Sequence, residues 1–307
     1  YKESQTMKWI IFDGDVDTYW IESMNTVMDA NKVLTLVSNE RIDLTAQMRV
    51  ICELDSLKNA SPATVSRNGL LYINESDIGW RPGVDVWLKS REDKNELNFL
   101  PALFDKYIDA TQFMSRSNGL IEISPVRCLT KANAVTAIVA RLLEQMTAEQ
   151  KTQENLEQVF LFATIWGFGG PLCDDRTNDN RTQFDEIFQQ TWKEALNVQY
   201  PKDSSVFDYF YDPKEEEWIA WDTLVKPYEY QPIGWGPGQT DFSFIYITYA
   251  DTVKNERILE LCVEFQQPIC LVGLAGTGKT AAVQKYLSER DPEFYSDSVI
   301  DVNFYTE

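Results

Sequence analysis

The sequence predicts an α/β protein that combines parallel-sheet modules with a separate small helical domain. Three observations predict this class. A glycine-rich loop at residues 273–280 lies between an apolar run and a helix-like run, an apolar run at residues 9–13 ends in an acid, and residues 86–167 repeat apolar side chains at helical spacing. With 307 residues the chain can form about two domains, each with its own core.

The glycine-rich loop has the phosphate-binding pattern G-x-x-x-x-G-K-T. Its residues are Gly273, Leu274, Ala275, Gly276, Thr277, Gly278, Lys279 and Thr280. It follows a predicted strand at 268–272 and precedes a predicted helix at 281–290, a context in which backbone N–H groups and a helix N-terminus bind phosphates. The Lys279 ammonium would reach the β- and γ-phosphates, and the Thr280 hydroxyl would bind Mg²⁺. We therefore expect a site for ATP or ADP with Mg²⁺.

The apolar run at residues 9–13 has the pattern of a buried Walker B strand, in which Asp13 would hold the Mg²⁺ shell. In a single P-loop module the phosphate loop precedes this acidic strand, whereas here the order is reversed. The simplest interpretation is that the sequence holds the back of one module and the front of the next. For Asp13 considered alone, an ordinary carboxylate at a strand end is the alternative.

Composition excludes several classes of function. The formal net charge of −20 disfavours a surface for nucleic acid or anionic lipid. The chain has no histidine, which excludes Ser–His and Cys–His nucleophile pairs and His-ligated metal sites. The longest uncharged run, residues 158–173, is too short for a membrane span of about 20 residues. We expect neither nucleic acid nor a membrane as a partner.

Hydrophobic periodicity and turn residues predict the remaining elements. In the first part they are a helix at 19–30, a hairpin formed by 33–37 and 41–45, a strand at 48–54, a short helix within 60–69 and a strand at 70–73. After a joint at 79–83 they are helices over 86–167, a connector at 174–180, a helix at 184–196 and a hairpin at 209–227. An exposed segment at 232–240 and a strand at 246–249 follow, then a helix at 253–264 capped by Asp251 and Thr252, and finally a strand at 298–305.

Several stretches together resemble dynein heavy chains. Residues 9–17 (WIIFDGDVD), 20–29 (WIESMNTVMD), 31–32 (NK), 61–67 (SPATVSR) and 79–82 (GWRP) resemble the second AAA+ module of that family. Residues 166–170 (WGFGG) look like the end of the helical lid of that module, and residues 249–253 (YADTV) with the phosphate loop resemble the start of the third module. Residues 13–17 with 33–42 (VLTLVSNERI) look more like axonemal, outer-arm chains than cytoplasmic ones.

The resemblance implies a segment of a ring of six P-loop AAA+ modules. Each module has a parallel sheet with flanking helices and a small helical lid. Residues 1–85 would be the C-terminal half of the large subdomain of module 2, 86–170 its lid, 171–240 a connector and N-terminal extension of module 3, and 241–307 the start of the module 3 large subdomain.

The resemblance also implies a function, partners and a location. The full-length ring would hydrolyse ATP and move toward the minus end of microtubules, in the cytoplasm and in the axoneme of cilia or flagella. Its partners would be the other AAA+ modules of the same heavy chain, further dynein heavy, intermediate and light chains, and microtubules bound through regions outside these residues. These residues alone would contain no complete catalytic site.

The resemblance also implies roles for individual residues. Gly14 stands where an active AAA+ site has a glutamate that polarises water, so we expect module 2 to bind ATP without hydrolysis; Asp15 acting as the base is the alternative. The γ-phosphate sensor position falls near Glu53 or Asp55, neither the usual amide or hydroxyl. Arg67 resembles an arginine finger that reaches in trans into the catalytic site of module 1, and an ordinary arginine paired to an acid is its alternative.

Module 3 would be a regulatory nucleotide site. Two other classes of function stay open from the sequence. One is a non-motor remodelling ATPase with tandem AAA+ modules, such as the dynein-related midasin type. The other is a nucleotide-regulated scaffold in which neither site turns over.

Overall fold

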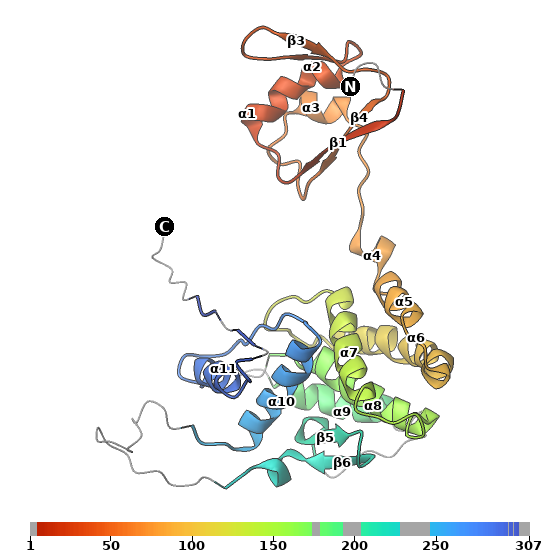
Figure 1. Ribbon diagram of the computed structural model, residues 1–307, viewed down its shortest axis with the longest axis vertical. Helices are drawn as coiled ribbons and strands as arrows, with labels where there is room; N and C mark the ends of the chain where they lie inside the picture. Colours follow the sequence, from red (N-terminus) through yellow and green to blue (C-terminus); the bar gives the residue numbers. More distant parts are fainter. Residues whose placement is uncertain are drawn as a thin grey trace, which may run out of the picture. The chain divides into compact units, whose positions relative to one another are not determined.

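The computed structural model describes residues 5–173, 179–192, 204–227, 246–293, 295–296 and 298–300. The chain divides into two compact units, Tyr1–Asp77 and Ile78–Glu307 (Figure 1). The boundary lies next to Gly79, at the start of the predicted joint. The finer division at residues 85, 170 and 240 stays a prediction.

The first unit contains a parallel pair of strands and a small hairpin. The pair is β1 (Lys8–Asp13) with β4 (Met48–Glu53), and the hairpin is β2 (Val33–Thr35) with β3 (Arg41–Asp43). The helices are α1 (Thr18–Ile21), the 3₁₀ helix η1 (Glu22–Met24), α2 (Asn25–Met28) and α3 (Pro62–Arg67), and the short helix α4 (Glu75–Ile78) crosses the boundary between the units. The predicted strands 9–13 and 48–54, the hairpin and the short helix within 60–69 are confirmed, while the helix predicted at 19–30 forms as three short pieces.

Two predictions for this unit are wrong. The strand β1 forms but is not buried, because the side chains of Trp9 and Ile11 are 58% and 61% exposed. Residues 70–73 form no strand, and Leu71 and Tyr72 are 85% and 82% exposed. Residues 70–73 have neither a neighbouring strand nor apolar cover within the described part of the chain, whereas β1 pairs with β4 and lacks only the apolar cover of a buried strand.

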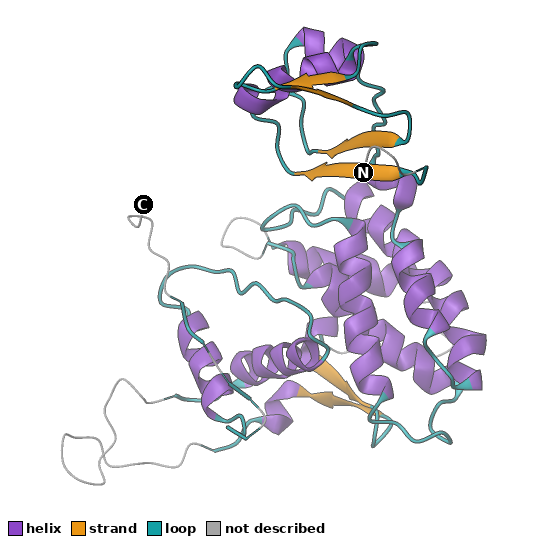
Figure 2. Cartoon of the chain, turned by 45° about the horizontal axis from the view of Figure 1, so that its top comes forward, coloured by secondary structure: helices purple, strands orange, loops and turns teal. Residues whose placement is uncertain are grey.

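The second unit is mainly helical (Figure 2). Its helices are α5 (Arg81–Lys89), α6 (Lys94–Ser117), α7 (Cys128–Leu143), α8 (Gln153–Gly169), α9 (Asn180–Trp192), α10 (Ala250–Glu264) and α11 (Lys279–Ser288), with the 3₁₀ helices η2 (Val206–Asp208) and η3 (Trp221–Leu224). The hairpin formed by β5 (Tyr209–Asp212) and β6 (Glu217–Ala220) confirms the one predicted at 209–227. Within the described residues, no helix has the length and apolar character needed to cross a bilayer.

The core of this unit lies between α6, α7 and α8. Asp93 caps α6 by accepting hydrogen bonds from the backbone N–H groups of Asn95 and Glu96, and the face of α6 that follows is fully buried at Phe104. Helix α8 is buried on all sides from Leu156 onward, as expected for a helix that is apolar all round. These residues confirm the helices predicted over 86–167.

Gly167 near the end of α8 permits close packing against α7. A Cβ atom on Gly167 would lie 2.5 Å from Val135 Cγ2 and 3.2 Å from the Lys131 carbonyl oxygen. Neither distance is compatible with an ordinary contact, so a larger residue would push the two helices apart. Close packing against α7 thus explains why the first glycine of the motif WGFGG, Gly167, has no larger side chain.

Aromatic side chains from later in the chain complete the same core. They come from α9, η2, the hairpin and η3, and are Phe184, Phe188, Trp192, Phe207, Phe210, Tyr211 and Trp221. Trp221 Nε1 donates to the Phe207 carbonyl at 3.0 Å, so the buried indole nitrogen is satisfied. The aromatic helix predicted at 184–196 is confirmed as α9 up to Trp192 and begins earlier, at Asn180, while residues 193–196 lie outside the described residues.

Predictions for the C-terminal part have mixed outcomes. The helix predicted at 253–264 is confirmed and begins at Ala250, where Thr252 Oγ1 accepts from the Tyr249 N–H at 2.8 Å. Asp251 does not cap it but pairs with Lys254 at 2.8 Å. Residues 246–249 and 268–272 form no strand. Residues 232–240, most of the connector and most of the strand predicted at 298–305 lie outside the described residues.

A buried carboxylate joins α6 to the segment before α8. The side chain of Glu96 is fully buried and accepts from Arg91 Nε at 2.6 Å and from Lys151 Nζ at 2.7 Å. Burial would raise the pKa of the Glu96 carboxyl, but hydrogen bonds from Arg91 and Lys151 outweigh burial and lower that pKa below its ordinary value. The folded chain therefore stabilises the ionised form of the Glu96 carboxyl.

The Glu96→Gln variant should lower the free energy of unfolding by about 3 kcal/mol at neutral pH, because it leaves two cations without their buried partner. Since the pKa of Glu96 is lowered in the folded chain, its contribution is complete above the ordinary value of about 4.3 and is lost as the pH falls through the folded value. Urea unfolding between about pH 7 and 3 measures both effects. The exposed Glu92→Gln is the charge-matched control, and equal pH dependence in wild type and Glu96→Gln would contradict the assignment.

Candidate nucleotide-binding site

The backbone of the glycine-rich loop requires glycine at two positions. Gly276 and Gly278 have φ angles of 80° and 81°, in the left-handed region that other residues rarely adopt. No atom lies within 4 Å of the place where a Cβ would stand at either residue. Backbone conformation, and not crowding, therefore selects glycine here.

The lysine of the loop lies over the loop itself. Lys279 Nζ donates to the carbonyl oxygens of Gly273 at 2.8 Å and Leu274 at 2.6 Å, and to Thr277 Oγ1 at 3.3 Å. Thr277 Oγ1 in turn donates to the Leu274 carbonyl at 2.9 Å. The ammonium group is thus already held at the loop by neutral oxygens, which phosphate oxygens would replace with charge-assisted bonds.

The helix after the loop begins without a side-chain cap. Gly278 is the N-cap of α11 and supplies no side-chain oxygen to the first N–H groups of that helix. These N–H groups and the positive end of the helix dipole suit an anion. Thr280 is exposed in the first turn. The residues present therefore fit a nucleotide: the loop and Lys279 would hold its phosphates, and the Thr280 hydroxyl would bind Mg²⁺ beside them.

The site is anchored to the helical core through α10. Leu261 and Cys262 of α10 belong to that core, and burial raises the pKa of the Cys262 thiol to about 11. Arg141 at the end of α7 forms ion pairs with Glu144 and with Glu264 at the end of α10. The helix that precedes the loop thus packs directly on α7 and the helical core.

A second set of polar contacts ties the helix after the loop to α10. Lys285 Nζ of α11 donates to Glu256 Oε2 of α10 at 3.3 Å. Arg257 of α10 in turn donates to Gln145 Oε1 at 3.3 Å, and Gln145 lies just beyond the end of α7. The elements on both sides of the phosphate loop are therefore joined to one core.

The predicted Walker B residue belongs to the other unit. Asp13 ends β1, and its register partner is Glu53 at the end of β4. The next residue, Gly14, has a φ of 145° and donates its N–H to the Glu53 carbonyl at 3.1 Å. The loop residues 273–280 are thus brought together in the second unit, whereas Asp13 is part of the first unit. Their roles toward nucleotide and Mg²⁺ stay predictions.

Arg67 ends α3 and is held by an acid of the same unit. Arg67 Nε donates to Asp29 Oδ1 at 2.5 Å, and Nη1 donates to the Ala63 carbonyl at 2.8 Å. The sequence left open both a finger and an ordinary arginine paired to an acid, and the ion pair is compatible with either. Sequence reasoning assigned no role to Asp29. The sequence feature that could have drawn attention to Asp29 was its position four residues after Asn25, because residues four apart share one face of a helix.

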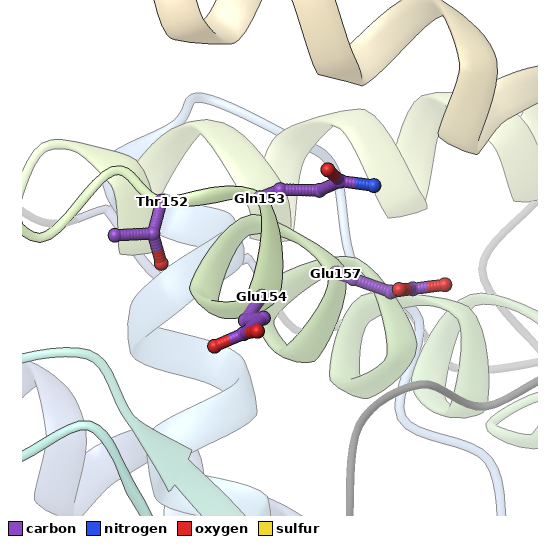
Figure 3. A pocket seen from close by; sticks show the side chains of 4 residues that line it. All are labelled: Thr152, Gln153, Glu154 and Glu157. Atoms are coloured by element: carbon purple, nitrogen blue, oxygen red, sulfur yellow. The ribbon is translucent and has the colours of Figure 1, made fainter.

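A pocket of about 430 Å³ lies at the start of α8, where Thr152, Gln153, Glu154 and Glu157 line it (Figure 3). The four side chains do not converge on one point in that view. Glu157 is already bound by Lys106 Nζ and by the Tyr107 hydroxyl, both at 2.6 Å. Burial and the neighbouring Glu157 carboxylate raise the pKa of the Tyr107 hydroxyl. The pocket is acidic and therefore does not suit nucleotide phosphates.

The phosphate loop, the uncapped helix behind it and the adjacent helical core are features of the AAA+ class of P-loop protein. Family models agree with this class. Residues 100–223 match the dynein heavy chain AAA lid domain, and residues 236–307 match the P-loop containing dynein motor region.

Curated relatives extend the match to nearly the whole chain. The chain is 37% identical over 304 residues to dynein axonemal heavy chain 9 of Homo sapiens, which is 97% of this chain and 6% of that protein. It is 36% identical over 303 residues to the dynein beta chain, flagellar outer arm, and 34% identical over 312 residues to the dynein alpha chain, flagellar outer arm, both of Chlamydomonas reinhardtii; each match covers 98% of this chain, and 6% and 7% of those proteins. The chain belongs to the dynein heavy chain family, and it spans a small fraction of the length of these relatives.

The Lys279→Ala variant of a heavy chain that carries this segment should lose nucleotide binding at this loop. The variant removes the ammonium group that lies over the loop carbonyls and that would bind the phosphates. Binding of a fluorescent ATP analogue, with the other phosphate loops disabled, measures the effect as a rise in Kd of at least about tenfold. Lys58→Ala removes an exposed lysine elsewhere in the chain and serves as the control. Unchanged affinity at this loop would contradict the assignment.

Proposed function

We propose that this chain is part of the ATP-driven ring of an axonemal dynein heavy chain that moves along microtubules in cilia or flagella. The observation that carries the proposal is the phosphate loop on α11, joined through α10 to a lid that matches the dynein family. The cytoplasm and the axoneme are the proposed location. The other modules of the heavy chain, further dynein chains and microtubules are the proposed partners.

Within the ring, the first unit belongs to module 2 and would bind ATP with Mg²⁺ at Asp13 without hydrolysing it. Gly14 has no side chain to polarise water, where an active site would have a glutamate. Its φ of 145° also disfavours any side chain at that position. Local backbone conformation thus supports the proposal that this site lost turnover.

Module 3 would be a regulatory nucleotide site. The helix α10, which precedes its loop, is tied to α7 of the lid through Glu264 and Arg141, so a change at the loop would reach that lid through α10. The match to dynein favours this motor over the midasin-type ATPase and the scaffold that the sequence left open.

Arg67 would act on module 1. A guanidinium that enters the neighbouring site neutralises charge on the γ-phosphate in the transition state, an effect worth about 10³-fold or more in kcat. Its place at the exposed end of α3, with the side chain 34% exposed, supports a role toward a neighbour.

The Arg67→Ala variant of the complete heavy chain tests this function. We expect its steady-state ATPase kcat to fall by about 10³-fold, because module 1 is proposed to supply most of the turnover. Arg41→Ala removes an exposed arginine of the same unit and should leave turnover unchanged. Equal turnover in Arg67→Ala and wild type would contradict the assignment.

A further inference from the structure

We propose that Asp29 is the positioning residue for Arg67, an inference that rests on the proposed function of Arg67. The carboxylate accepts from Nε at 2.5 Å, and the Ala63 carbonyl accepts from Nη1 at 2.8 Å. Together these bonds fix the plane of the guanidinium group from two sides. Within the described residues, Nη2 donates to no protein group, so one corner of the group stays available to an anion of a neighbouring module.

A second polar contact lies beside the first and fixes α3 on α2. The buried Thr64 hydroxyl donates to Asn25 Oδ1 at 3.0 Å. Asn25 and Asp29 are four residues apart along α2 and its C-cap, and Thr64 and Arg67 are three residues apart along α3. Each pair therefore shares one helical face. The buried contact between Thr64 and Asn25 sets the position of α3, and the exposed contact between Arg67 and Asp29 sets the direction of the Arg67 side chain.

The backbone of Asp29 is itself held in place. Its N–H donates to the Asn25 carbonyl at 3.0 Å, and its carbonyl accepts from the Lys32 N–H at 3.0 Å. Asp29 is the C-cap of α2, with extended backbone angles that turn the chain toward β2. A carboxylate on a fixed backbone gives Arg67 a fixed partner.

The exposure of the pair argues for geometry over stability. The Arg67 and Asp29 side chains are 34% and 43% exposed, and pairs this accessible contribute little to folding. A free arginine side chain populates many rotamers, and restricting it before the neighbour arrives lowers the entropic cost of reaching the transition state. The ion pair therefore acts on catalysis in the preceding module and has little effect on whether the unit folds.

ATPase kinetics of the complete heavy chain test the inference through Asp29→Asn, Asp29→Glu, Arg67→Ala and the double variant Asp29→Asn/Arg67→Ala. We expect Asp29→Asn to lower kcat by about 10- to 100-fold with the KM for ATP changed by less than about twofold, because a misplaced group loses transition-state stabilisation only. Asp29→Glu keeps the charge and should recover part of the loss. Glu40→Gln removes an exposed carboxylate from the same unit and should behave as wild type.

The double variant separates positioning from a structural role. Asp29→Asn should cost nothing further in the Arg67→Ala background, because Asp29 acts only through Arg67. A further loss of similar size there, or turnover in Asp29→Asn equal to or faster than wild type, overturns the inference while the proposed function stands. Turnover unaffected by Arg67→Ala overturns the proposed function itself. If Asp29→Asn does not assemble, Asp29→Glu decides the question alone, with a partial loss of kcat supporting the inference and none opposing it.

Discussion

The packing of α10 on α7 is the constraint that joins the phosphate loop to the core of the second unit. Leu261 and Cys262 bury the apolar face of α10 in the lid core, and Arg141 pairs with Glu264 at the end of the contact. Burial supplies most of the stabilisation, because the ion pair is partly exposed and such pairs contribute little on their own. The helix that leads to the phosphate loop is therefore a part of the lid as much as of the module that the loop belongs to.

Helices and local motifs could be predicted from the sequence because their determinants are local. The apolar spacing of α6 and α7 and the turn of the β5–β6 hairpin lie within a few residues of the structures that they specify. The phosphate loop was equally predictable, since Gly276 and Gly278 meet a backbone requirement at their own positions. The loop positions and the lid helices were predicted for these reasons.

Strands were predicted less well because a strand depends on partners that are distant in sequence. Residues 268–272 and 70–73 have the apolar composition of strands but receive no pairing within the described part of the chain. Trp9 and Ile11 lie on a strand that does pair with β4, but no apolar side chains within the described part of the chain bury them. The contact between Arg67 and Asp29 was also invisible to motif reasoning, because only the packing of α3 on α2 brings together residues that are 38 positions apart.

Gly14 and Arg67 of the first unit would have opposite consequences for catalysis. At the end of β1, Gly14 has no side chain that could polarise water. Helix α3, later in the same unit, carries the Arg67 guanidinium at its exposed end. A module built in this way would serve its neighbour's chemistry and not its own, which agrees with Asp13 and Lys279 belonging to separate units.

Cryo-electron microscopy of the complete heavy chain with a non-hydrolysable ATP analogue and Mg²⁺ tests the central claim most directly. Two separate nucleotides are expected, one beside Asp13 and the other beside Lys279, each completed by residues of the heavy chain outside these 307 residues. A single nucleotide flanked by both Asp13 and Lys279 on one sheet would contradict it.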